Sequence, residues 1–274
     1  MIATVRILET VTRTALLGVR LWDPVSGGPV SDRIQVTETA SGRTALTNPS
    51  GVFAFHDLPG LHAASVGLAG GAFWQSPPAR ASFTFEVVDL DQRFLPFRFS
   101  ADPPCEGLFA PACVGATSIP LFSSPGRPTV PGFATVRADL WDVVADVPAA
   151  SAVLEIDGVG NAPWRGVADA QGRVLLLCPY PEPRWLGSSP PAGSLALSDQ
   201  SWPVTLSVLY ATGATGDPRN PAPAADICAV LTQPPATLLS TVSPESPLPA
   251  QTLVFGRELI LRSGSMPVLL VVPT

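Results

Sequence analysis

Two histidines, four cysteines and a few acidic pairs are the residues of this 274-residue sequence whose types could support catalysis or metal binding. His56 ends an expected strand, and His62 follows a Leu-Pro-Gly-Leu turn. Neither belongs to an HExxH pattern, in which two histidines one helical turn apart bind zinc. We interpret both histidines as surface or capping residues rather than as a metal pair.

The cysteines are too far apart in sequence for a C-x-x-C metal or redox motif. Cys105 and Cys113 lie near each other, and a disulfide between them would pin the intervening loop. Such a bond is disfavoured in a chain without an export signal. Cys178 lies within a strand-like apolar run and is expected to be a small buried residue. The pairing state of Cys105 and Cys113 stays open at this stage.

The acidic pairs are explained by turn formation. Asp89 and Asp91 flank an expected hairpin turn, and Glu155 and Asp157 form a similar local pair. Neither pair has enough oxygen ligands nearby for calcium. A G-x-S-x-G elbow is absent, and the glycine-rich stretch 67–71 lacks the Lys-Ser/Thr of a phosphate loop. The sequence therefore predicts no catalytic, metal-binding or cofactor-binding residue, no cofactor and no enzyme activity.

Three residues are candidates for contacts with a partner protein. Trp74 and Trp185 lie in proline-bounded loops, where an exposed aromatic side chain can anchor a partner. Burial beneath a sandwich edge is an equally good explanation for each tryptophan. Arg93 borders an apolar strand and could form a salt bridge across an interface, although simple solvation is the alternative.

Composition narrows the class of protein. The net charge of −6 argues against nucleic-acid binding, because such proteins present basic surfaces. Charged residues make up only 14% of the chain and hydrophobic residues 46%, which favours a subunit packed against neighbours. No apolar run is long enough for a membrane span, and no secretory signal is visible. We therefore expect a cytoplasmic protein, or part of a particle assembled in the cytoplasm.

An internal repeat indicates how the chain is built. Leu-Trp-Asp occurs at 21–23 and again at 140–142, and each copy is followed by a turn and an alternating strand. An Asn/Asp-x-x-Gly turn then follows at 48–51 and at 169–172, each time before an apolar strand. The 32 prolines and 23 glycines disfavour long helices. The repeat predicts an all-β protein with two tandem antiparallel β-sandwich domains and proline-rich loops.

The domain limits follow from the strand-like runs. A hairpin is expected from runs 82–88 and 93–99, and a C-terminal hairpin from runs 253–262 and 267–272. A short helix is expected near 225–231. The expected units are a first sandwich at 1–103, a linker with Cys105 and Cys113 at 104–130, and a second sandwich at 131–274 with a proline-rich insertion at 211–250. A loop this long is usually functional or packed on a partner.

The repeat resembles the carboxypeptidase regulatory-like, or transthyretin-like, β-sandwich domain, an immunoglobulin-like architecture. The resemblance covers residues 19–61 and, more weakly, 136–183, through the Thr-Asn-x-x-Gly-x-Phe-x-Phe pattern and the Leu-Pro-Gly after it. It implies a structural or binding module. Transthyretin-like hydrolases end in a distinctive tetrapeptide, whereas this sequence ends Val-Val-Pro-Thr.

A looser resemblance links phrases at 93–99, 168–174 with 179–183, and 255–262 to accessory proteins of phage-tail-like contractile injection particles. It implies a non-catalytic structural subunit that acts through contacts with other protein subunits. The alternative is a surface adhesion or carbohydrate-binding module.

Overall fold

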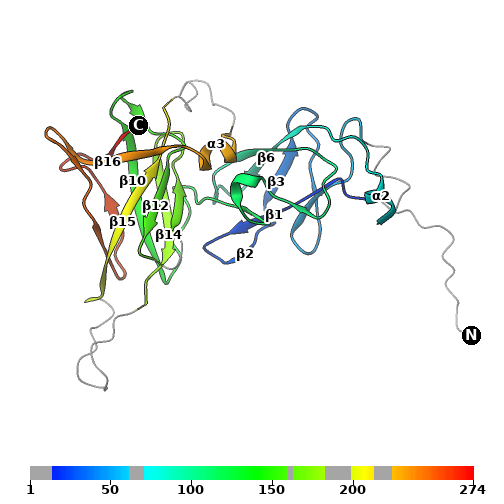
Figure 1. Ribbon diagram of the computed structural model, residues 1–274. Coiled ribbons are helices and arrows are strands. Elements are labelled where there is room, and N and C mark those ends of the chain that lie inside the picture. Colours follow the sequence, from blue (N-terminus) through cyan, green and yellow to red (C-terminus); the bar gives the residue numbers. More distant parts are fainter. Residues whose placement is uncertain (1–13, 62–70, 160–162, 183–198, 213–223) are drawn as a thin grey trace, which may run out of the picture.

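The computed structural model describes residues 14–61, 71–159, 163–182, 199–212 and 224–274, and strands dominate these segments. Two β-sandwiches lie end to end, and the short helix α3 (Ile227–Leu231) lies where they meet (Figure 1). The predicted all-β sandwich fold is confirmed. Among the described segments, no helix has the length and apolar character required to cross a membrane.

The first sandwich packs a sheet of order β2-β1-β5-β4 against a three-stranded sheet of order β3-β6-β7. Side chains of β1 alternate between buried and less buried positions, as expected for a strand with one face on the core. The predicted hairpin is confirmed, since β6 pairs antiparallel with β7. The elements of this part are β1 (Leu17–Asp23), β2 (Gly28–Pro29), β3 (Ile34–Glu38), β4 (Leu46–Thr47), β5 (Val52–Phe55), α2 (Gly71–Gln75), β6 (Phe83–Asp89) and β7 (Phe97–Ala101).

The segment expected to be a linker, 104–130, contributes strands to the first sandwich. Within it, β8 (Leu108–Phe109) and β9 (Ile119–Pro120) both pair in parallel with β1, and the 3-10 helix η1 (Ala112–Val114) lies between them. Ile119 and Leu121 are buried in the first core. A boundary at residue 103 therefore falls before the last strands of the first sheet.

All strands of the second sandwich are hydrogen-bonded into one continuous sheet. Its order is β11-β10-β20-β16-β15-β12-β13, and β14, β17, β18 and β19 pair with strands of this series. The insertion expected at 211–250 contains α3 and the strands β16 and β17, so much of it belongs to regular structure. The strands are β10 (Phe133–Asp142), β11 (Val147–Pro148), β12 (Val153–Asp157), β13 (Trp164–Val167), β14 (Arg173–Pro179), β15 (Ser201–Leu209), β16 (Pro235–Val242), β17 (Glu245–Pro247), β18 (Gln251–Val254), β19 (Leu259–Leu261) and β20 (Leu269–Val272).

The internal repeat is visible in the strand pairing. β1 pairs antiparallel with β2 and β5 and in parallel with β8 and β9. β10 pairs in the same way, antiparallel with β11 and β14 and in parallel with β19 and β20. The predicted C-terminal hairpin was therefore wrong: its two runs both pair with β10, each in parallel.

The Asn/Asp-x-x-Gly turns have the same hydrogen bonds in both copies. Asn48 Oδ1 accepts from the N–H groups two and four residues later, at 3.0 and 2.9 Å, and Asp169 Oδ1 does so at 2.9 Å in both cases. Each turn ends on a glycine with positive φ, Gly51 at 73° and Gly172 at 76°. A Cβ at Gly172 would lie 2.4 Å from the carbonyl oxygen of Leu140, so this position also requires glycine for space.

Two hydrophobic cores fill the molecule. The second core lies inside the second sandwich and includes Cys178, which is fully buried as predicted. The first core continues beyond the first sandwich, because it also contains Val153 and Val167 of the second sheet and Ile227 and Val230 of α3. One apolar cluster therefore spans both halves of the chain.

Candidate functional site at the junction of the two sandwiches

The described residues hold no group of three or more His, Cys, Asp or Glu side chains that could bind a metal ion. His62 lies outside the described residues. His56 follows β5, and its Nδ1 is buried without a hydrogen-bond partner.

The aspartate of each Leu-Trp-Asp motif closes the turn that follows it. Asp23 accepts from the backbone N–H groups of Val25 at 3.0 Å and Ser26 at 3.2 Å. Asp142 accepts in the same way from the N–H groups two and three residues later, at 2.8 and 3.0 Å. Both carboxylates are almost fully buried, so they act as turn supports and not as groups open to a substrate.

Each of these carboxylates has a further partner far along the chain. Arg127 binds both oxygens of Asp23, at 3.0 and 2.7 Å, and the Tyr210 hydroxyl donates to Asp142 at 3.0 Å. Burial alone would raise the pKa of Asp23, but Arg127 and the turn N–H groups hold that pKa below its ordinary value. Burial and the bond to Asp142 raise the pKa of Tyr210.

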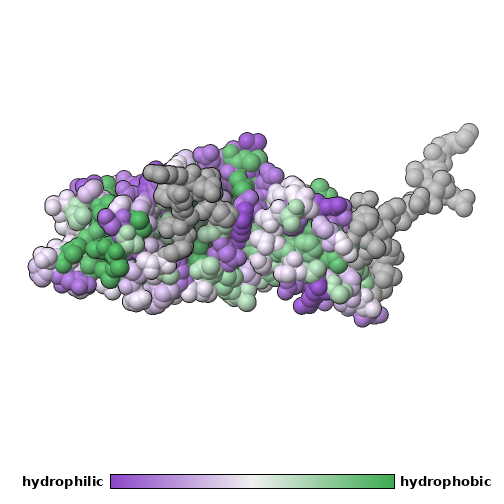
Figure 2. Space-filling view, turned by 90° about the horizontal axis from the view of Figure 1, so that it is seen from above, coloured by the Kyte–Doolittle hydropathy of each residue, from purple (hydrophilic) through white to green (hydrophobic). Residues whose placement is uncertain are grey.

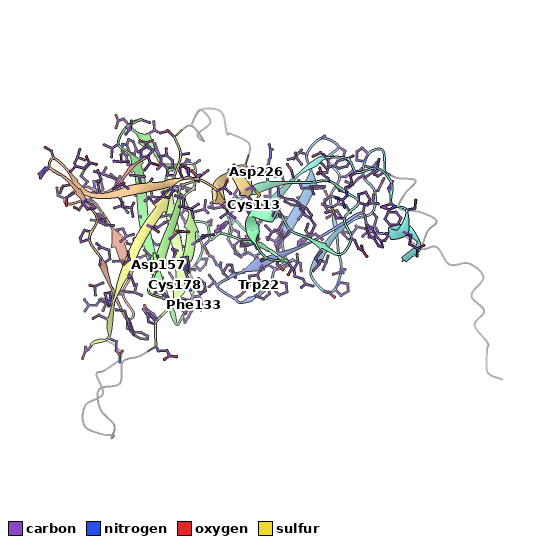
Figure 3. All side chains as sticks on the ribbon, viewed as in Figure 1. Trp22, Cys113, Phe133, Asp157, Cys178 and Asp226 are labelled. Atoms are coloured by element: carbon purple, nitrogen blue, oxygen red, sulfur yellow. A yellow bond between two sulfur atoms is a disulfide. The ribbon has the colours of Figure 1, made fainter. Side chains whose placement is uncertain are left out.

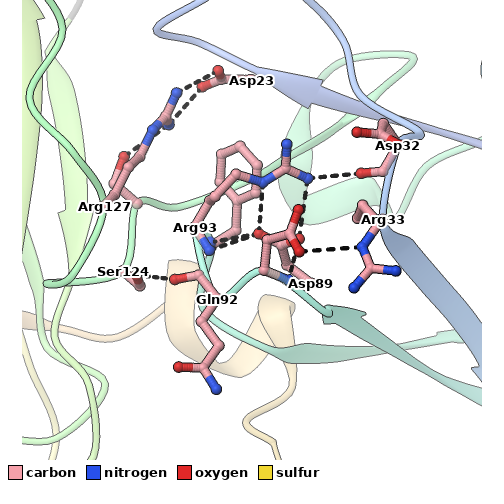
Figure 4. Close-up of polar contacts among 11 residues, drawn as sticks. Asp23, Asp32, Arg33, Asp89, Gln92, Arg93, Ser124 and Arg127 are labelled. Carbon is pink, nitrogen blue, oxygen red and sulfur yellow. Dashed lines mark hydrogen bonds and ion pairs between the residues drawn. The ribbon is translucent and has the colours of Figure 1, made fainter.

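Figure 4 shows a second ion-pair network close to the first, centred on Asp89. The Asp89 carboxylate binds Arg93 Nε at 3.0 Å, and Arg93 also donates to the carbonyl oxygen of Asp32 at 2.7 Å. Burial alone would raise the pKa of Asp89, but the Arg93 side chain and the N–H groups of Asp91 and Arg93 together hold that pKa below its ordinary value. The guanidinium groups of Arg93 and Arg127 lie 5.5 and 4.7 Å from the ring centre of Phe94.

Helix α3 connects the two sandwiches through apolar contacts. On the second sheet, Val153 pairs with Val167 on one side and with Leu209 on the other, so these side chains form one row on the same face. That row and the buried α3 residues Ile227 and Val230 belong to the first core, together with the phenylalanines of β6 and β7. These two side chains of the helix are therefore buried in a core that both halves of the chain share.

Backbone and polar bonds fix the position of α3. The N–H of Arg98, on β7, donates to the carbonyl oxygen of Ala225 at 2.8 Å, which covers the open edge of the three-stranded sheet. Asp226 caps the helix, accepting from the N–H groups of Cys228 and Ala229. At the other end, the Gln233 side chain donates to Ser151 O at 2.8 Å and so ties the helix to the second sandwich.

A disulfide links η1 to α3, between Cys113 and Cys228. Figure 3 shows Cys113 and Asp226 near each other at this junction, whereas Cys178 lies in the second sandwich. The Cys105–Cys113 bond that the sequence left open does not form, because Cys113 pairs with Cys228 and Cys105 is a free thiol. Burial raises the pKa of Cys105 and raises that of Cys178 to about 12, so neither thiol is activated as a nucleophile.

We call the unit made by residues 225–233 together with the Cys113–Cys228 bond the α3 clasp. Sequence reasoning found the helix but not its role, because the partners of α3 are about a hundred residues away along the chain. The presence of four cysteines was the signal in the sequence that a disulfide could form. It did not indicate which two would pair, because the bonded residues are 115 apart in sequence.

The residues expected to contact a partner have different surroundings. Trp74 lies on α2, is partly buried, and packs edge-on against Phe73 with ring centres 4.7 Å apart. Arg93 uses its guanidinium within the first sandwich, as described above. Trp185 lies outside the described residues. Among the acidic residues singled out above, Asp91 binds Arg33 at 3.1 Å, and Glu155 binds Arg165 on the neighbouring strand at 2.7 Å.

Comparisons with known proteins do not place the chain in a family. No family model matches the chain, and no curated protein matches it. Among solved structures, the chain is similar to the Bacillus anthracis TIE protein, at 7% identity and a TM-score of 0.22. The match covers 95% of this chain and 34% of that one, so the chain spans about a third of the matched structure.

Proposed function

We propose that this chain is a non-catalytic structural component of a multi-protein assembly, in which two sandwiches held as one rigid body bind other protein subunits. The observation that carries the proposal is the α3 clasp. Tandem domains joined by an exposed linker move independently by default. Here the buried side chains of α3, a covered sheet edge and a disulfide hold the two sandwiches together, which suits a building block of fixed shape.

The use of the buried polar groups supports a role without turnover. Asp23, Asp89 and Asp142 are buried, and each accepts hydrogen bonds from turn N–H groups. Enzymes keep such groups available and tune their pKa values toward the working pH. In this protein, the pKa values of Asp23 and Asp89 are moved further below that range.

The kind of assembly follows from the sequence resemblances. We propose a contractile phage-tail-like injection particle, on the phrases at 93–99, 168–174 with 179–183, and 255–262, and carboxypeptidase regulatory-like repeats as the ancestry of the two sandwiches. Exposed apolar side chains fit a subunit that is covered by neighbours. In the described segments, the large exposed ones are Trp22, Leu46, Leu90, Val144, Val242, Ile260 and Met266.

Isolation of particles from cells that express an affinity-tagged chain tests this proposal. We expect sheath and tube proteins to co-purify with the tagged chain in fixed ratio. The Cys113→Ser/Cys228→Ser double variant should be incorporated less well, whereas Cys105→Ser should be incorporated normally. A chain recovered as a free monomer, with particles that lack it, would contradict the proposal.

A surface adhesion or carbohydrate-binding module is the second candidate, and the Cys113–Cys228 disulfide favours it. Disulfides persist mainly in oxidising compartments, such as the cell surface. Cell fractionation combined with a glycan array separates the two candidates. A surface location with specific glycan binding would favour the module, and an intracellular location without glycan binding would remove it.

A further inference from the structure

The β2-β1-β5-β4 sheet of the first sandwich has one face on the core and one face turned outward. The outward face is apolar, although such faces are usually polar in antiparallel sandwiches. In β1, the residues that face away from the core are Gly18, Arg20 and Trp22. Their neighbours across the sheet continue the apolar character. We call these residues the β1 face: Gly18, Arg20, Trp22, Pro29, Leu46, Val52, Ala54, Leu108 and Pro120.

The strand register explains the shape of this face. Leu46, Ala54, Gly18 and Leu108 form one row across four strands, with the two smallest residues at its centre. Trp22 is 37% exposed and Leu46 is 67% exposed, so the face is open to contact. Tryptophan within an apolar patch is typical of the centre of a protein interface.

Arg20 is the only charged residue on the β1 face, and its environment is unusual. Its Nε is buried and has no hydrogen-bond partner. The only other buried side-chain nitrogen or oxygen without a partner in the described segments is Nδ1 of His56, directly after β5. A buried donor without a partner is costly, so such atoms are rare in folded proteins. One of these atoms lies on β1, and the other directly follows β5, the antiparallel neighbour of β1.

We infer that the β1 face docks an apolar surface of a protein partner that places a carboxylate on Arg20. Arg20 is only partly buried, so a carboxylate docked on this face would bind its guanidinium through charge-assisted hydrogen bonds in a site that excludes water. A second copy of this chain packed face to face would instead bring two Arg20 guanidinium groups into one apolar contact. This inference rests on the proposed role as a component that assembles with other proteins.

Selection from a random peptide library displayed on phage tests the inference, with the full oxidised chain as the immobilised target. Peptides selected on the wild-type chain should carry Asp or Glu beside apolar residues. Synthetic versions should bind Arg20→Met and Trp22→Ser more than about tenfold more weakly in fluorescence anisotropy. Arg257→Met is the matched control, because Arg257 is an exposed arginine of the second sandwich, and its affinity should be unchanged.

Folding and self-association are measured on the same samples. Both β1-face variants should keep the wild-type circular dichroism spectrum, because neither side chain belongs to a core. A selection that yields no Arg20-dependent acidic peptide would overturn the inference while leaving the co-purification test of the proposed function intact. Self-association of the wild-type chain that Arg20→Met abolishes in sedimentation velocity would also overturn it, in favour of a second copy.

Discussion

Removal of the Cys113–Cys228 disulfide should destabilise this protein strongly, and the size of the effect follows from the chain. The bond joins residues 115 apart, so it closes a long loop in the unfolded state. In the chain-entropy relation, a loop of that length corresponds to about 5 kcal/mol of stability at 25 °C. Measured values for native disulfides run from about 2 to 5 kcal/mol, so the loop-length figure is the upper end of the expected range.

Urea unfolding followed by tryptophan fluorescence measures this effect. The Cys113→Ser/Cys228→Ser double variant should unfold at a lower urea concentration than the oxidised wild type. Its unfolding should also depend more steeply on urea, because its unfolded chain is less compact and exposes more surface. Reduction of the wild type with dithiothreitol should reproduce both changes, since it breaks the same bond.

Cys105→Ser is the control, because Cys105 is a free thiol. It should change the free energy of unfolding by less than about 0.5 kcal/mol. Equal urea midpoints for oxidised and reduced protein would refute the reasoning. So would a Cys105→Ser variant that loses as much stability as the double variant, since that result would place the disulfide elsewhere.

Three further changes have outcomes that the structure defines. The pKa of Asp23 is lowered in the folded state, so the unfolded chain binds the proton first, and stability should fall as the pH drops below about 4. Asp23→Asn should flatten that decline in acid-unfolding curves, and an unchanged decline would count against the ion pair. Gly172→Ala places a Cβ against a backbone carbonyl at positive φ and should lower the free energy of unfolding by at least about 3 kcal/mol. Gly27 also has positive φ but has open space around it, so Gly27→Ala should lower the free energy of unfolding by only about 1–2 kcal/mol; chemical denaturation measures both. Tyr210→Phe leaves a buried Asp142 oxygen without its donor and should lower the thermal midpoint, by an amount that corresponds to about 2 kcal/mol; an unaltered midpoint would argue against that bond.

The strands, turns and hairpin that form between residues close in sequence could be predicted. Alternation in β1, the Asn48 and Asp169 turns and the β6–β7 hairpin depend on residues close together in sequence, and all three were expected. Strand pairings between distant segments could not be predicted, because they leave no pattern in the residues near either strand. The parallel contact of Gly18 with Leu108 is one example, and it explains why the end of the first sandwich was expected too early.

The candidate site was harder to predict for the same reason. Helix α3 is visible as a short apolar run with an aspartate cap, but nothing near it in sequence indicates that Ile227 and Val230 enter the core of the other sandwich. Arg20 is likewise indistinguishable from a solvated arginine in an alternating strand until its neighbours across the sheet are known.

Residual dipolar couplings of weakly aligned protein give the most direct test of the central claim, that the α3 clasp makes one rigid body of the two sandwiches. The amides of β1, β6 and β7 report the orientation of the first sandwich, and those of β10, β12 and β15 report that of the second. A single alignment tensor should fit both groups on the present structure. Two tensors of different magnitude would mean that the sandwiches move independently, and they would contradict the account.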